Sequence, residues 1–248
     1  MPSRNMKVVL TYDGTDFYGW QIQRDGRTVQ GVVEEALEMI HGYPVRVKAA
    51  GRTDSGVHAE GQVINFITDS TVPDDRFAKA LNSSLPRDIR AISSTAVDDG
   101  FHARYSARKR IYKYYILPGS YSDPFSRRFC LTVKKLLDVP RLNSFASKIV
   151  GTHDFTTFAA VGDQSESRIR DITSASFYYE GKFIVFKIEG NAFLWRMVRS
   201  LTGTILELAA ENKPPERLEE ILNCRDRSFA GSTAPAKGLT FHRVVYDG

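Results

Sequence analysis

The pattern that most constrains the fold is an amphipathic helix placed between two strands near the N-terminus. Thr28 is a suitable N-cap, and apolar residues follow it at helical spacing: Val29, Val32, Val33, Ala36, Leu37 and Ile40. Residues 7–12 form an apolar and aromatic strand pattern before the helix, and residues 45–49 alternate apolar and basic side chains after it. A helix enclosed by strands in this way predicts helices packed on a sheet.

The rest of the chain continues this plan. Further strands are expected at 62–68, 89–97, 110–117, 174–179, 182–189 and 239–246, and helices at 74–85, 139–150 and 193–211, with a short helix before the last strand. The order of these elements predicts an α+β fold with two similar sheet-plus-helix halves. We place the first half at residues 1–105 and the second at residues 106–248.

Composition narrows the class of protein. Hydrophobic residues make up 42% of 248 residues, which supports a packed core and argues against disorder. The formal charge is +5, which favours a polyanionic partner without establishing one. Cys130 and Cys224 are too few for a zinc site or a disulfide framework and are expected to be reduced core thiols. With neither a secretory core nor an apolar run of about 18–20 residues, we expect a soluble, cytoplasmic protein.

The segment from Ala50 to Gly61 is unusual for a connection between two strands. Gly51 and Gly56 frame Arg52, Asp54 and Ser55, and glycines permit close approach of another molecule to the backbone. Arg52 supplies positive charge that favours an ionised carboxylate two residues away, which suits a nucleophile. The alternative is a solvated turn in which Asp54 and Ser55 bond only to the local backbone. His58 is expected to be a structural hydrogen-bond donor.

Residues 101–115 interleave aromatic and cationic side chains in a strand-like stretch. Aromatic rings can stack on bases while arginine and lysine neutralise phosphates, so this mixture favours an RNA surface. Strand periodicity places Arg110, Tyr112 and Tyr114 on one face. The alternative is a sheet with its aromatics in the core and its cations in solvent.

The long helix at 193–211 has an apolar face typical of a core helix. Arg196, Arg199 and Gly203 lie on another face, where two arginines beside a glycine could approach an anion. The alternative is a solvated basic face. Residues 191–193 are expected to form the N-terminal cap region.

Several separated segments carry a family resemblance as an ordered set. They are Tyr12-Asp13-Gly14-Thr15, Tyr18-Gly19-Trp20-Gln21, residues 50–58, Phe101-His102-Ala103-Arg104, Tyr112-Lys113-Tyr114, residues 153–158, Asn191-Ala192-Phe193 and Met197-Val198-Arg199. Over nearly the whole chain they resemble the tRNA pseudouridine synthase A family. The most diagnostic segment is Gly-Arg-Thr-Asp-x-Gly-Val-His, which contains Asp54.

The resemblance implies an isomerase that detaches uracil from its ribose, rotates it and rejoins it through carbon, without a cofactor or metal. Asp54 matches the nucleophile, which attacks either the ribose C1′ or the pyrimidine ring. Tyr112 matches the aromatic residue that lies against the target base. Arg199 matches the cation that pairs with the nucleophile, and Arg52 matches a residue that holds the flipped-out nucleotide.

The resemblance also implies a pseudouridine synthase fold with mainly antiparallel sheets flanking a central basic cleft. The expected partner is tRNA, bound by a homodimer, and the expected targets are uridines 38, 39 and 40 of the anticodon stem-loop. Trp195 and Ile111 depart from the family pattern locally. The main rival hypothesis is a non-catalytic RNA-binding module built on residues 101–115, and a phosphate hydrolase is disfavoured because no Gly-rich phosphate loop or metal-ligand cluster is found.

Overall fold

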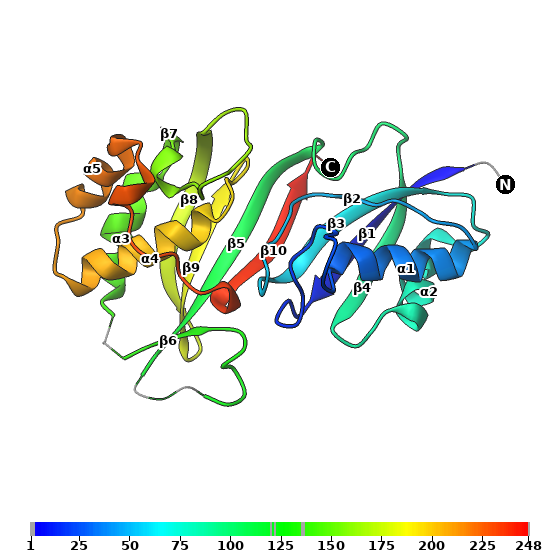
Figure 1. Cartoon of the computed structure of the whole chain (residues 1–248), viewed down its shortest axis with the longest axis horizontal. Helices are drawn as coiled ribbons and strands as arrows, with labels where there is room; N and C mark the ends of the chain where they lie inside the picture. The colour runs from blue at the N-terminus through cyan, green and yellow to red at the C-terminus, as the bar shows by residue number, and fades with distance from the viewer. Residues whose placement is uncertain (1–2, 120, 122, 135–136, 248) are drawn as a thin grey trace. The chain divides into compact units, whose positions relative to one another are not determined.

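The computed structural model describes residues 3–119, 121, 123–134 and 137–247, and it consists of two compact units. Unit 1 contains residues 1–108 and 241–248, and unit 2 contains residues 109–240 (Figure 1). Each unit combines a sheet with helices, which confirms the predicted α+β class. The last strand begins in unit 2 and continues into unit 1, so residues 241–247 belong to the same unit as the N-terminal segments.

Unit 1 is built on a mainly antiparallel sheet with strand order β4-β1-β3-β10, and β2 pairs with β3. The strands are β1 (Arg4–Tyr12), β2 (Lys48–Ala49), β3 (His58–Thr68), β4 (Ile89–Val97) and β10 (Leu239–Tyr246), and the helices are α1 (Val29–His41), η1 (Asp74–Arg76) and α2 (Phe77–Ser84). Helices α1 and α2 lie on one face of this sheet (Figure 1). The apolar residues Met6, Val8 and Leu10 alternate along β1 and are fully buried in this core.

Helix α1 forms as its sequence predicts. The Thr28 side chain accepts a hydrogen bond from the amide of Gly31, so it is the N-cap. Gly42 has a left-handed φ of 75°, and its amide donates to Glu38, which ends the helix. The strand expected at residues 45–49 is much shorter, because only Lys48 and Ala49 pair with β3.

Unit 2 has the strand order β5-β9-β8-β7, with β6 paired in parallel to β5. Its strands are β5 (Ala107–Pro118), β6 (Leu131–Val133), β7 (Gly151–Asp154), β8 (Ile169–Glu180) and β9 (Phe183–Gly190). Its helices are α3 (Val139–Ala146), η2 (Ser147–Ile149), η3 (Thr156–Phe158), α4 (Met197–Ala210), α5 (Glu216–Cys224), η4 (Arg227–Phe229) and η5 (Ala236–Gly238). The sequence pattern missed β6 and β7, which have only three and four residues.

In both units an asparagine side chain links a helix to the sheet through two hydrogen bonds. In unit 1 the amide of Asn82 on α2 bonds to both backbone groups of Ala91 on β4, at 2.8 Å each. In unit 2 the amide of Asn143 on α3 bonds to both backbone groups of Phe177 on β8, also at 2.8 Å each. A side-chain amide therefore satisfies strand groups that would otherwise need a further strand.

Helix α4 begins four residues later than the sequence predicts. Arg196 has a left-handed backbone (φ 60°), and the Trp195 amide donates to the carboxylate of Asp163. The left-handed turn at Arg196 and the bond from Trp195 to Asp163 keep residues 193–196 outside the helix. Arg196 therefore does not share a helical face with Arg199. Asn191 does not cap α4 either, because its side-chain oxygen accepts from the amide of Asp171.

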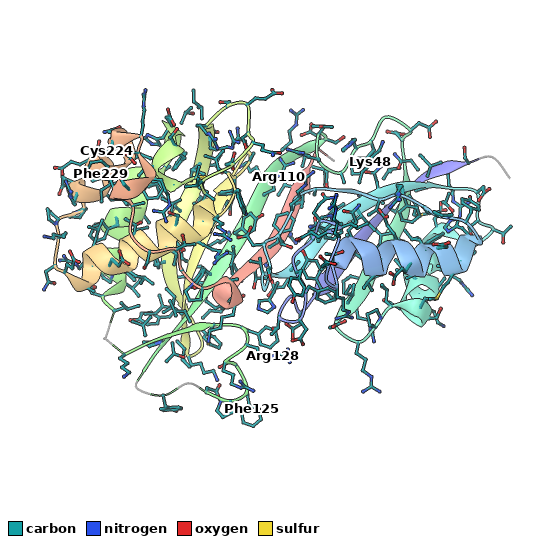
Figure 2. All side chains as sticks on the ribbon, viewed as in Figure 1. Lys48, Arg110, Phe125, Arg128, Cys224 and Phe229 are labelled. Atoms are coloured by element: carbon teal, nitrogen blue, oxygen red, sulfur yellow. The ribbon has the colours of Figure 1, made fainter. Side chains whose placement is uncertain are left out.

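The two cysteines differ in their surroundings. Cys130 is buried, as predicted, and burial raises the pKa of its thiol. Cys224 is exposed at the end of α5, so the expectation of a core thiol is wrong there (Figure 2). The last turn of a short surface helix leaves one side open to solvent.

Gly203 provides a test of how closely α4 is packed. An added methyl group there would lie 1.8 Å from the carbonyl oxygen of Ser232. Alanine is normally better than glycine inside a helix by about 1 kcal/mol, yet we expect Gly203→Ala to lower the free energy of unfolding by about 1–3 kcal/mol because the neighbouring backbone must move. Chemical denaturation measures this change. Gly100→Ala is the control, since its added methyl has nothing within 4 Å. Equal or greater stability of the Gly203 variant would contradict the packing.

Candidate functional site

The loop predicted to carry the nucleophile connects β2 to β3 in unit 1. Arg52 is exposed and Asp54 is half-buried, and they lie two residues apart on this loop. His58 is already the first residue of β3, so the loop is shorter than the sequence pattern indicates. Gly56 has a φ of 77°, which its lack of a side chain permits and which turns the chain toward β3.

The loop backbone is held by the segment that follows β1. The amide of Trp20 donates to the carbonyl of Thr53 at 3.0 Å, and the amide of Gly56 donates to the carbonyl of Phe17 at 3.3 Å. Gly19 has a φ of 88°, and a methyl group there would lie 2.7 Å from the Thr53 carbonyl oxygen. A glycine is therefore required at position 19 by close backbone contact with the residue preceding Asp54.

A pair of buried hydroxyls joins β1 to the same loop. The side-chain oxygens of Tyr12 and Thr53 lie 2.8 Å apart, and both residues are buried. Burial raises the pKa of Tyr12 to about 12, so its hydroxyl keeps its proton at neutral pH. The amide of Gln62 on β3 donates to the carbonyl of Gly51 at 2.9 Å and holds the start of the loop.

His58 has a structural role in this region. Its Nδ1 accepts a hydrogen bond from the amide of Gly14 at 3.0 Å, and Asp13 Oδ1 lies 3.2 Å from the same nitrogen. A nitrogen that accepts from Gly14 cannot also donate to Asp13, so we assign it as an acceptor. The ring is 3% exposed and ties the turn after β1 to the start of β3. The expectation of a structural histidine is right, although this nitrogen accepts rather than donates.

Tyr112 lies on β5 in unit 2. It is buried, and its ring meets that of Phe193 edge to face with centroids 5.1 Å apart. Tyr114, two residues on, is fully buried, and its hydroxyl donates to the carbonyl of Pro235 at 2.8 Å. Burial raises the pKa of Tyr114 as well. Tyr114 is therefore a core residue, as the alternative for residues 101–115 predicts.

Arg199 lies in the first turn of α4. Its Nε donates to the carbonyl of Ala234 at 2.8 Å, and its own carbonyl accepts from the amide of Ala234 at 3.1 Å. These two bonds fix the start of the side chain and orient its guanidinium. Gly203 is buried against Ser232, so it lies neither on an anion-binding face beside Arg199 nor on a solvated one.

The predicted site residues thus fall into two groups. Asp54 and Arg52 share one loop of unit 1, and Tyr112 and Arg199 lie on β5 and α4 of unit 2. Sequence reasoning missed the Tyr12 and Thr53 pair that anchors the Asp54 loop. The sequence signal for this pair is the short segment Tyr12-Asp13-Gly14, which carries the family pattern but does not indicate the contact with Thr53.

In the part of the chain that the structure describes, no group of three or more histidine, cysteine, aspartate or glutamate side chains is arranged to hold a metal ion. Among the same residues, no helix has both the length and the apolar character needed to cross a membrane.

Known proteins resemble this chain over almost its whole length. A family model described as tRNA pseudouridine synthase matches residues 8–106 and 145–247. The tRNA pseudouridine synthase A of Borrelia hermsii is 43% identical over 98% of this chain and 100% of that protein. The protein of the same name from Halalkalibacterium halodurans is 45% identical over 95% of this chain and 90% of that protein, and the one from Acetivibrio thermocellus is 41% identical over 98% and 100%.

The chain belongs to the tRNA pseudouridine synthase family. Members are isomerases that convert uridine in tRNA into pseudouridine, so the predicted family and enzyme class are confirmed. The matched ranges include Arg52, Asp54 and Arg199, whereas Tyr112 lies between them.

The hydroxyl pair beside Asp54 yields a prediction. We expect Thr53→Val to lower the free energy of unfolding by about 1–3 kcal/mol, because the buried Tyr12 hydroxyl loses a partner. Adding Tyr12→Phe to this variant should cost less than Tyr12→Phe costs in the natural chain, because the hydroxyl removed has already lost its bond to Thr53. Urea denaturation of the four proteins measures the coupling, and strict additivity would show that the two hydroxyls do not interact.

Proposed function

We propose that this enzyme converts uridine to pseudouridine in the anticodon stem-loop of tRNA with Asp54 as its nucleophile. The observation that carries the proposal is the construction of the Asp54 loop. Backbone bonds from Trp20 and Gly56, together with a buried hydroxyl pair, immobilise the residues on both sides of Asp54. A carboxylate carried by a loop whose backbone is fixed in this way suits the orientation that nucleophilic catalysis needs.

The reaction exchanges one bond to ribose for another. The bond between N1 of uracil and C1′ breaks, the base rotates, and a bond from C5 to C1′ forms. C5 loses its proton and N1 gains one, so no atom is added and no oxidant is required. Asp54 attacks either C1′ or the pyrimidine ring. The rotation requires a base that has left its stack, so the target nucleotide is flipped out of the stem-loop.

Tyr112, Arg199 and Arg52 are assigned supporting roles. Tyr112 lies against the target base and assists in removing the C5 proton; its fixed ring, packed on Phe193, supports this assignment. Arg199 supplies the positive charge that keeps the nucleophile anionic, and its Nε bond to Ala234 fixes its direction. Arg52 is exposed beside Asp54 on the same loop and holds a phosphate of the flipped nucleotide.

The substrate and assembly follow the same proposal. The targets are uridines 38, 39 and 40, and their neighbouring positions favour recognition of tRNA shape over base edges. The enzyme acts as a cytoplasmic homodimer and uses no cofactor or metal. Exposed aromatic side chains at Tyr121, Phe125 and Phe129 support a contact with another molecule, and Figure 2 shows Phe125 and Arg128 on this segment between β5 and β6. Light scattering of the purified protein tests the dimer.

The nucleophile is tested by Asp54→Asn, which keeps the size of the side chain and removes its charge. We expect pseudouridine formation on unmodified tRNA to fall at least about a thousandfold, with tRNA affinity nearly retained. Mass mapping of the product identifies the modified positions. Asp75→Asn removes a charge from an exposed position of the same unit and should be fully active. Full activity of the Asp54 variant would disprove the assignment and favour a non-catalytic RNA-binding protein.

The role of Tyr112 is tested by removing its hydroxyl. Tyr112→Phe should lower kcat about a hundredfold while tRNA affinity changes little, because the hydroxyl acts on the base and not on the backbone. Single-turnover kinetics and binding assays separate the two effects. Tyr115→Phe, on the opposite face of β5, is the control. Equal losses of turnover and affinity in the Tyr112 variant would indicate a binding role only.

A further inference from the structure

Unit 1 presents a second surface that the proposed chemistry does not use. Residues 98–106 lead from β4 to β5 and end in exposed side chains. The ring of Tyr105 is 76% exposed, and it meets the half-buried ring of His102 with centroids 4.4 Å apart. The guanidinium carbon of Arg104 lies 5.8 Å from the centre of the Tyr105 ring.

Two buried asparagines hold this segment in place. Asn5 on β1 donates to the carbonyls of Asp98 and Phe101 at 3.0 and 2.9 Å. The oxygen of Asn65 on β3 accepts from the amide of Ala103 at 2.8 Å. Both asparagines are 1% exposed, and Asn65 also donates to Asn5 at 2.9 Å. Buried amides stabilise a fold only when they are satisfied, and these two use their hydrogen bonds on this segment and on each other.

The end of the segment is equally fixed. The amide of Ser106 donates to the carbonyl of His102 at 2.9 Å, and Ser106 Oγ accepts from the amide of His102 at 3.0 Å. The amide of Arg104 donates to Nδ1 of His102 at 3.1 Å, and the Tyr246 hydroxyl donates to the carbonyl of Ala103 at 2.8 Å. An exposed tyrosine on such a rigid segment loses little conformational entropy when a ligand stacks on it.

Lys48 adds a second cation to this surface. It pairs with Asn65 across β2 and β3, and Asn65 pairs with Lys7 across β3 and β1, so the three side chains share one face of the sheet. Residues 98–106 cover this face, since Lys7 Nζ lies 5.7 Å from the ring centre of Phe101. Lys48 itself is exposed (Figure 2).

Two positive charges act on His102. Burial lowers the pKa of His102, and the charges of Lys48 and Arg104 lower it further. Asp98 and Asp99 begin the segment, but the neighbouring charges that act on His102 are the two cations. The surface therefore combines the exposed ring of Tyr105, packed beside His102, with two cationic side chains, and this combination suits an unpaired nucleotide.

We propose that Lys48, His102, Arg104 and Tyr105 form a nucleotide-binding surface for the tRNA, in addition to the loop of Asp54. An unpaired base stacks on Tyr105, and the flanking phosphates bind Arg104 and Lys48. The inference rests on the proposed function, because it assigns these residues to the same substrate.

The test compares tRNA binding by variants of the full chain. Tyr105→Ala should raise the Kd for an unmodified tRNA transcript about tenfold, and Tyr105→Phe should stay within about twofold because the ring remains. Tyr179→Ala is the matched control, since Tyr179 is 65% exposed on β8 and belongs to neither proposed site. In steady-state assays the loss should fall mainly on KM. Thermal unfolding checks that each variant is folded.

The cations are tested through salt. Lys48→Gln and Arg104→Gln should each lower the slope of log Kd against log salt concentration by somewhat less than one, since each removes one phosphate contact. Unchanged slopes would overturn the phosphate contacts. An unchanged Kd for Tyr105→Ala would overturn base stacking. If that variant instead altered self-association while its tRNA affinity stayed the same, base stacking would also be overturned.

The same experiment separates this inference from the proposed function. Pseudouridine formation by the natural chain is measured with the same transcript. If it occurs while Tyr105→Ala binds normally, the surface is disproved and the catalytic proposal stands. If no pseudouridine forms but the Tyr105 variant binds more weakly, the surface stands and the catalytic proposal fails. Absence of tRNA binding by the natural chain would overturn both.

Discussion

The contact between the segment after β1 and the loop of Asp54 is the constraint on which the candidate catalytic region depends. Gly19 lets the backbone approach Thr53 to a distance that a side chain would forbid, and Tyr12 meets the Thr53 hydroxyl from the core. His58 joins the same region, because its Nδ1 accepts a hydrogen bond from the amide of Gly14 in the turn after β1. The loop that carries the carboxylate is thus held on both sides of Asp54 by bonds to Tyr12 and to the segment after β1.

The two faces of the unit 1 sheet differ in their buried side chains. One face is apolar and is covered by α1 and α2, which supplies the stability of the unit. The opposite face carries Asn5 and Asn65, whose amides hold residues 98–106. A chain that only needed to fold could place apolar residues at these two positions. Their cost in desolvation is offset only by satisfied hydrogen bonds, and the result is a rigid segment that presents His102 and Tyr105.

Much of the fold followed from local patterns, and the failures have identifiable causes. The Thr28 cap and the strands at 89–97 and 239–246 were predicted because their signals are short-range. Strands β6 and β7 are too short to show an alternating pattern of apolar residues, and β2 has only two paired residues where the sequence predicts a strand over 45–49. Helix α4 was predicted too early because the left-handed turn at Arg196 depends on a contact between Trp195 and Asp163, which lie 32 residues apart. The sequence left Gly203 open between an anion-binding face and a solvated face, whereas its lack of a side chain is required by the contact with Ser232.

By itself, the sequence determined the α+β class, the family and the identities of the candidate residues, because periodicity and ordered motifs are properties of the chain alone. Local chemistry left Asp54 open between a turn residue and a nucleophile. Only the tertiary structure decided which groups fix its loop, that Tyr114 belongs to the core, and that residues 241–248 join the first unit. The physical reason is that close backbone contacts, burial and strand pairing join residues far apart in sequence, and no local pattern records those partners.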